Sequence, residues 1–213
     1  RCILSTTLAL LTNAMLFGQE TSLYIPKELA KAYEDQSRSY RGIPGTSYFQ
    51  NTANYEIEAQ FDPETGNLKG EELIHYQNRS QDTLDQLVIR VYMNFFQKGA
   101  PRDFDIGPAD LHDGVVIEDL TINGKAVKQS GGPHLLSERG TIYRIKLIQP
   151  LLPEAEADIS LKWEVQMPTR VSLRMGKYGE KNDWLVAYWY PQVSVYDDVS
   201  DWDTHPYTGS AEF

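Results

Sequence analysis

The sequence predicts an all-β fold of antiparallel strands, sandwich-like or saddle-like, preceded by a signal peptide and one short helix. Several segments alternate polar and apolar residues with a period of two, which is typical of strands with one wet face. Turn-forming residues separate these segments. Only one segment has the apolar spacing of a helix. Many short strands, with turns between them and little helix, indicate a β-sandwich or a related architecture.

Composition excludes several classes of protein. A chain of 213 residues fits one large domain, or one domain with extensions. Its 30 acidic and 20 basic residues give a formal charge of −10, so the chain lacks the cationic surface that binders of nucleic acid or anionic membranes need. A mean hydropathy of −0.46 excludes a protein with many membrane spans. The single cysteine excludes a disulfide framework and a cysteine-based zinc site within this chain.

The first 19 residues have the pattern of a secretory signal peptide that lacks its own start. Arg1 precedes an apolar run over residues 3–17, and the small residue Gly18 follows before the sequence turns polar. The run is too short and too speckled with polar residues for a bilayer span. A buried helix is the alternative, but no capping residue and no polar face support it. We therefore expect a periplasmic or secreted protein.

Residues 20–44 are predicted to be an N-terminal extension with a short helix. Pro26 suits the first turn of a helix, where its missing N–H has no cost. Leu29 and Tyr33 lie one turn apart, and the Gly-Ile-Pro-Gly sequence of residues 42–45 ends any helix.

The β domain is expected over residues 45–213. Residues 55–61 alternate strictly and residues 68–76 return after the turn-forming stretch 62–67, which predicts a hairpin. Residues 87–93 are apolar on both faces apart from Arg90, which predicts a central strand. Further strands are expected at 115–122, which runs into the hairpin dipeptide Asn123-Gly124, and at 143–147 and 159–165. The chain stops at residues 211–213 in what resembles the opening of a strand, so we expect a longer protein.

Catalytic motifs are scarce. None of the four histidines, at positions 75, 112, 134 and 205, belongs to a His-Glu-x-x-His zinc motif. We interpret His75 as a strand-face residue and the Asp110–Asp113 stretch as a polar loop. Asn78-Arg79-Ser80 matches a glycosylation sequon, a pattern that also arises by chance. No nucleophile elbow and no phosphate-binding loop occurs.

Two segments near the C-terminal end concentrate functional side chains. One holds Asp197, Asp198, Asp201, Asp203 and His205. Spaced carboxylates can hold calcium, but the segment lacks the glycine and the final glutamate of an EF-hand, so a solvated turn is the simpler interpretation. The other is the aromatic run Tyr188-Trp189-Tyr190-Pro191. Exposed, this run would be a binding platform, whereas in an all-β chain a core strand is the commoner outcome.

The aromatic run also belongs to a set of separated motifs. Met175-Gly176-Lys177-Tyr178-Gly179 precedes it, and the Trp-Tyr-Pro of residues 189–191 leads into Val195-Tyr196-Asp197-Asp198. Together with Trp202, Pro206-Tyr207 and the stretches around Tyr48 and Trp163, this set resembles the zinc metallopeptidases of the aminopeptidase N family. The resemblance covers residues 45 to 213 and is greatest to secreted bacterial members.

This resemblance implies an N-terminal β-saddle domain that packs on a thermolysin-like catalytic domain. The zinc ligands, the general base and the substrate loop of that family would all lie beyond Phe213. The chain itself would then hold no catalytic residue, no metal ligand and no cofactor, while the full-length protein would carry zinc. Its expected partners are the catalytic domain of the same polypeptide and a peptide substrate.

One family feature can be carried over to named positions. In many members a Gln-aromatic-Glu-Pro segment of the N-terminal domain enters the active site and helps to hold the free amine of the substrate. The matching positions are Tyr188, Trp189 and Tyr190, followed by Pro191. A tyrosine hydroxyl can donate or accept a hydrogen bond, but it lacks the carboxylate that pairs with an ammonium group. The sequence thus predicts substrate binding at these three residues and leaves strict aminopeptidase specificity open.

Two other classes of function are compatible with the residues. The chain could be a periplasmic β-sandwich that binds carbohydrate or a protein partner through exposed aromatic side chains, or a structural domain of a longer surface protein. A His-Glu-x-x-His motif downstream of Phe213 would discriminate between these classes and the metallopeptidase.

Overall fold

The computed structural model describes residues 24–128, 132, 134–170 and 172–210. The predicted signal peptide and the last three residues lie outside this range. The regular structure of the described part is mostly antiparallel β-sheet with one α-helix, α1 (Lys27–Glu34), which confirms the all-β prediction. None of the helices in the described ranges is long and apolar enough to cross a membrane.

Three long strands form one layer of the fold. β1 (Thr52–Asp62) pairs with β2 (Asn67–Gln77) through the predicted hairpin, and β8 (Glu156–Gln166) pairs with β2 on the other side. Along β8 every second residue is buried, as expected for a strand with one wet face. The period-two pattern therefore predicted these strands and their inward faces correctly.

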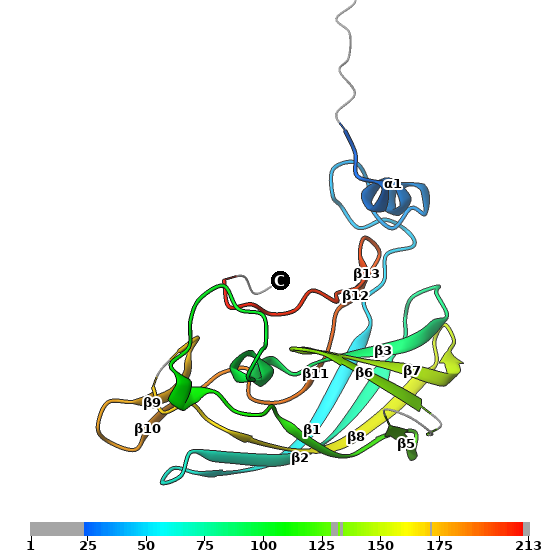
Figure 1. Cartoon of the computed structure of the whole chain (residues 1–213). Coiled ribbons are helices and arrows are strands. Elements are labelled where there is room, and N and C mark those ends of the chain that lie inside the picture. Colours follow the sequence, from blue (N-terminus) through cyan, green and yellow to red (C-terminus); the bar gives the residue numbers. More distant parts are fainter. Residues whose placement is uncertain (1–23, 129–131, 133, 171, 211–213) are drawn as a thin grey trace, which may run out of the picture.

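The same sheet continues through shorter strands and turns over the first layer (Figure 1). β4 (Val116–Ile122) lies beside β8 and is joined to β5 (Lys125–Lys128) by the predicted turn, in which Asn123 and Gly124 both have positive φ. Such a turn matches the twist of the flanking strands. The order then runs through β6 (His134–Arg139), β7 (Ile142–Leu151), β3 (Leu84–Arg90) and β11 (Gln192–Val193).

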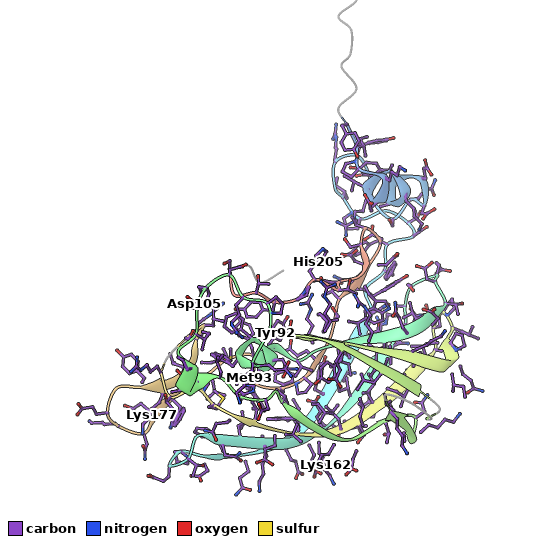
Figure 2. The ribbon with its side chains drawn as sticks, in the orientation of Figure 1. Tyr92, Met93, Asp105, Lys162, Lys177 and His205 are labelled. Carbon is purple, nitrogen blue, oxygen red and sulfur yellow. The ribbon has the colours of Figure 1, made fainter. Side chains whose placement is uncertain are left out.

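Buried side chains from both halves of this nine-stranded sheet form one hydrophobic cluster. Ile74 and Ile159 come from the first layer, and Leu87 and Ile145 come from the second, each fully buried. Figure 2 shows Met93 directed into this interior, whereas Lys162 points away from the first layer. The two layers of the described sheet therefore share one continuous core.

The predicted strand over residues 87–93 needs correction at its end. It begins earlier, at Leu84, and stops at Arg90, and a 3-10 helix follows over Tyr92–Phe96. β3 is buried on both faces as predicted, but it lies next to the edge of the sheet, between β7 and the two-residue β11. A second 3-10 turn spans Pro108–Asp110.

Two small hairpins complete the fold. β9 (Met175–Tyr178) pairs with β10 (Asp183–Val186), and β12 (Tyr196–Asp197) pairs with β13 (Asp201–Trp202). The first hairpin extends beyond the main sheet, with Lys177 on it (Figure 2). The β10–β11 connection brings the aromatic run back over the first layer.

The N-terminal extension is fastened to the β12–β13 hairpin. Arg38 makes a two-pronged salt bridge to Asp198, with Nε and Nη2 each 2.7 Å from a carboxylate oxygen, and Ser37 donates a hydrogen bond of 2.7 Å to the same carboxylate. The hydrogen bond from Arg38 lowers the pKa of Asp198 to about 2. The extension is thus docked by charge, and just beyond it the Phe49 ring contacts that of Tyr196.

Candidate functional site

The aromatic run lies in the connection between β10 and β11, outside any strand. Tyr188 has a φ of 52°, a left-handed conformation that is uncommon for a residue with a side chain and that breaks an extended run. Tyr188, Trp189 and Tyr190 are each half-buried, and Pro191 is buried. The run is therefore neither a core strand nor a fully exposed platform. We call residues 187–191 the aromatic loop.

Tyr188 lies in a cluster of rings at one end of this loop. Its ring centroid is 5.2 Å from that of Tyr92 and 5.7 Å from that of Tyr207. The guanidinium carbon of Arg174 lies 5.2 Å from the ring centroid, and the same guanidinium donates a hydrogen bond to the Tyr188 hydroxyl. A tyrosine hydroxyl can both donate and accept hydrogen bonds, and here its oxygen accepts from Arg174.

Trp189 and Tyr190 turn toward the inner face of the first layer. The Trp189 ring lies 5.6 Å from Trp163 on β8, and the Tyr190 ring lies 5.6 Å from Tyr55 on β1 in an edge-to-face arrangement. The two loop rings contact one another at 4.9 Å. The loop thus bridges β1 and β8 and covers the strand between them, β2.

The residue of β2 at this place is Glu72, and it is buried. Its exposed fraction is 3%, and both carboxylate oxygens lack a hydrogen-bond partner within the described structure. Burial raises the pKa of Glu72 to about 8, because an apolar environment disfavours the charged form. The group is therefore mostly protonated at neutral pH.

Two neighbours of Glu72 share its environment. Burial raises the pKa of Tyr55 to about 12, and the Tyr55 hydroxyl accepts a hydrogen bond of 3.0 Å from the Val193 amide. Trp163 lies across Gly70, where a Cβ would approach the indole ring to 2.7 Å, and its Nε1 also lacks a partner among the described atoms. Only glycine leaves room for this indole, two residues along β2 from Glu72.

Sequence reasoning missed Glu72, although a signal existed. Glu72 occupies a position that the period of β2 assigns to the inner face, between Gly70 and Ile74. A carboxylate on an otherwise apolar face is a misfit that alternation alone can reveal. Tyr92, Arg174 and Tyr207 reach the loop from distant segments, which local pattern cannot show.

This arrangement can bind and can exchange a proton, but it holds no catalytic constellation. The described residues contain no group of three or more histidine, cysteine or acidic side chains that could hold a metal ion. The loop offers tyrosine hydroxyls, aromatic faces and the arginine of residue 174. These groups suit hydrogen bonding and stacking against a peptide or another ligand.

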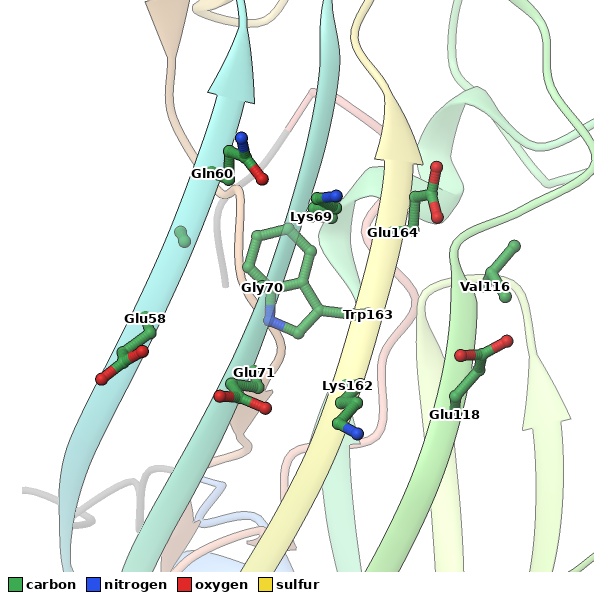
Figure 3. Close-up of a pocket in the computed structure, with 11 residues that line it drawn as sticks. Glu58, Gln60, Lys69, Gly70, Glu71, Val116, Glu118, Lys162, Trp163 and Glu164 are labelled. Atoms are coloured by element: carbon green, nitrogen blue, oxygen red, sulfur yellow. The ribbon is translucent and has the colours of Figure 1, made fainter.

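A surface hollow of about 390 Å³ lies on the outer side of the first layer and of β4 (Figure 3). Four glutamates line it together with two lysines and the exposed side chain of Val116. A hydrogen bond to Asp119 raises the pKa of Lys162. The hollow is an open charged surface, and its lining contains no nucleophile and no histidine. Its glutamates are residues 58, 71, 118 and 164.

The acidic segment does not gather into a cation site. Asp197 accepts hydrogen bonds from the amides of Val199 and Ser200, Asp198 pairs with Arg38, and Asp203 pairs with Arg90. The interpretation as a solvated turn is also wrong for Asp198, whose side chain is only 6% exposed. These carboxylates anchor structure.

The histidines at positions 75 and 112 and the asparagine of the sequon have structural contacts within the fold. His75 is on the outer face of β2 and contacts Asp158 at 2.7 Å, which raises the pKa of the imidazole. His112 is half-buried against Phe96, and burial lowers its pKa. Asn78 is fully buried, and its amide donates to three backbone carbonyls, so the sequon cannot accept a glycan in this fold.

Comparisons with known proteins give few matches. No protein-family model matches the chain, and no curated protein matches it. Among solved structures, a variant of an M1 zinc metallopeptidase from Deinococcus radiodurans covers 66% of this chain and 26% of its own, with 14% identity and a TM-score of 0.40. A variant of a two-domain M1 zinc metallopeptidase bound to L-tryptophan covers 62% and 24%, with 11% identity and a TM-score of 0.37.

This chain therefore spans about a quarter of the length of these solved structures. At such TM-scores the likeness carries no argument about fold or function.

Proposed function

We propose that this chain is the N-terminal, non-catalytic β domain of a zinc-dependent metallopeptidase, and that it borders the substrate cleft of a catalytic domain in the same polypeptide. The observation that carries this proposal is the place of the Trp-Tyr-Pro motif in the fold. The motif lies in a half-buried loop outside the strands, so Trp189 and Tyr190 keep part of their surface exposed to a partner. A core strand would have left no such surface.

The order of the sequence motifs along the chain supports the proposed assignment to a zinc metallopeptidase. The segments that resemble the aminopeptidase N family are residues 175–179, 189–198 and 202–207, and contacts at or beside two of them reach the aromatic loop. Tyr188 contacts Tyr207 from the last of these segments, and Arg174 precedes the first. In this proposal the catalytic domain supplies the zinc ion and the general base, and a zinc-activated water attacks the peptide carbonyl.

The aromatic loop is assigned the binding of substrate in this scheme. The hydroxyls of Tyr188 and Tyr190 would hydrogen-bond the peptide, and the neighbouring rings would exclude water. The proposal includes export from the cytoplasm, and the apolar run over residues 3–17 supports this part.

Substitution of the tyrosine hydroxyls tests this role in the full-length enzyme. Tyr188→Phe keeps the ring and removes one hydrogen-bonding group, so we expect transition-state binding to weaken by about 1–2 kcal/mol. This corresponds to a roughly five- to thirty-fold loss of kcat/KM on a peptide reporter. Tyr190→Phe is expected to have a similar effect.

The matched control is Tyr178→Phe on β9, where the side chain is 66% exposed. This control is expected to leave kcat/KM unchanged. If Tyr188→Phe and Tyr190→Phe both stay within about twofold of the wild type, the hydroxyls do not touch substrate and the loop has a packing role only.

A further inference from the structure

Apolar and aromatic groups surround the buried side chain of Glu72, and the residue also borders an open hollow that Glu56, Glu58 and Glu71 line. In the register of the sheet it lies opposite Ile57 on β1 and Leu161 on β8. Gly70 and Ile74 are its neighbours on the same face of β2. Above it pass the rings of the aromatic loop, which contact Tyr55 and Trp163 on either side.

None of the charged or titratable groups packed around Glu72 neutralises it. The titratable side chain coupled to Glu72 is Tyr55 on β1, and Tyr55 is in turn coupled to Tyr190 in the loop and to Tyr92 on the 3-10 helix. β8 contributes no charged group on this face. The cation nearest to these tyrosines, Arg90, lies over the Tyr92 ring at 5.7 Å and is engaged by Asp203.

The cover over Glu72 is held mainly by ring contacts. The loop is fixed at one end by the β9–β10 pairing and at the other by β11, which has two residues paired with β3. Between these ends Trp189 and Tyr190 rest on Trp163 and Tyr55. A segment that packs through side chains, between short strands, can open locally without unfolding the sheet below it.

We propose that Glu72 is a pH-dependent latch for the aromatic loop. When the carboxyl group is neutral, the loop packs over it. When the group ionises, the carboxylate has no buried partner, so it is stabilised by water only if Trp189 and Tyr190 move aside. A buried, unpaired carboxylate is costly, and local opening is the way to solvate it.

The direction of the pH dependence follows from the same burial. Because burial raises the pKa of Glu72 to about 8, from an ordinary value of 4.5, opening of the loop becomes progressively less costly as the pH rises from 4.5 to 8 and changes little above pH 8. The pKa of Tyr55 is about 12, so this tyrosine stays neutral through the transition. The latch does not depend on the proposed function. If both hold, the latch controls the surface that borders the substrate.

Amide hydrogen exchange measures this opening directly. We expect exchange at the amides of residues 188–190, corrected for its intrinsic dependence on pH, to rise at least about tenfold between pH 6.5 and 9. Amides in the middle of β2 and β8 should show no such rise. Glu72→Gln is neutral at every pH, so in this variant the corrected exchange of the loop should stay constant.

Glu71→Gln is the matched control, because Glu71 is the next residue of β2 and is exposed on the opposite face. It should retain the wild-type transition. A carboxyl carbon NMR titration of Glu72 in the wild-type chain provides a second measurement, in which a midpoint near 8 is expected. A midpoint below about 5.5, or loop exchange that follows the same curve in wild type and Glu72→Gln, would overturn the latch.

Discussion

Replacement of Glu72 by methionine is expected to raise the free energy of unfolding at pH 7 by about 3 kcal/mol. In the unfolded chain this carboxyl group ionises near its ordinary pKa of 4.5, whereas in the fold the pKa is about 8. Each unit of pH above 4.5 therefore favours the unfolded state by about 1.4 kcal/mol until the folded pKa is reached. Methionine has a similar volume and no charge, so it removes this cost while filling the same space.

The sign of this effect is unusual for a glutamate. The folded-state pKa is raised, so the stability linked to this group is complete below pH 4.5 and is lost as the pH rises toward 8. Urea denaturation at pH 4.5, 6 and 8 should therefore show a difference between Glu72→Met and wild type that increases with pH. Glu71→Met on the exposed face should show no such trend. A destabilised Glu72→Met variant at pH 8 would mean that the carboxylate has a partner and is paired in the fold.

Replacement of Arg90 by methionine is expected to lower the free energy of unfolding by about 3 kcal/mol. The Arg90 side chain is 8% exposed and forms a salt bridge with Asp203. It also donates hydrogen bonds to the Ser194 hydroxyl at 3.1 Å and to the His205 carbonyl at 3.2 Å. One guanidinium thus ties the C-terminal segment to β3, and its loss leaves a partly buried carboxylate and two acceptors unpaired.

A double-mutant cycle with Asp203→Asn separates the contribution of the ion pair from that of the other hydrogen bonds of Arg90. Urea unfolding curves are measured at pH 7 for both single variants and for the double variant. We expect the double variant to be clearly less destabilised than the sum of the singles, because each single change leaves the other charge unpaired. Additive effects, or a loss below about 1 kcal/mol for Arg90→Met, would show that the segment is held by its aromatic contacts alone.

The long strands of the fold were predictable because one of their faces is exposed to solvent, so polar and apolar residues alternate along them. β1, β2 and β8 have eleven residues each, long enough for a period of two to stand out, and the Asn123-Gly124 turn has a strong local signature. The five strands from β9 to β13 have two to four residues each, too few to show a period. Their positions depend on contacts with distant segments, so local pattern could not predict them.

The substrate-binding role of Tyr188, Trp189 and Tyr190 stays a prediction, whereas their conformation is a finding that the sequence did not give. The structure places the three residues in a loop outside the strands. Their half-burial depends on Tyr92, Trp163 and Tyr207, which tertiary packing alone brings to the loop. The carboxylates of the acidic segment were interpreted as solvated, but they have cationic and backbone partners. One of these partners, Arg38, comes from an extension more than a hundred residues away, so local pattern could not reveal it.

The most direct test of the proposed function is the zinc content and peptidase activity of the natural polypeptide that carries this domain. Antibodies raised against residues 24–210 would isolate it from its source without any assumption about its ends. The account predicts one tightly bound zinc per polypeptide and hydrolysis of an aminoacyl or peptide reporter that is lost on chelation and restored by zinc. A purified polypeptide that binds no stoichiometric zinc and cleaves no such reporter would contradict the account.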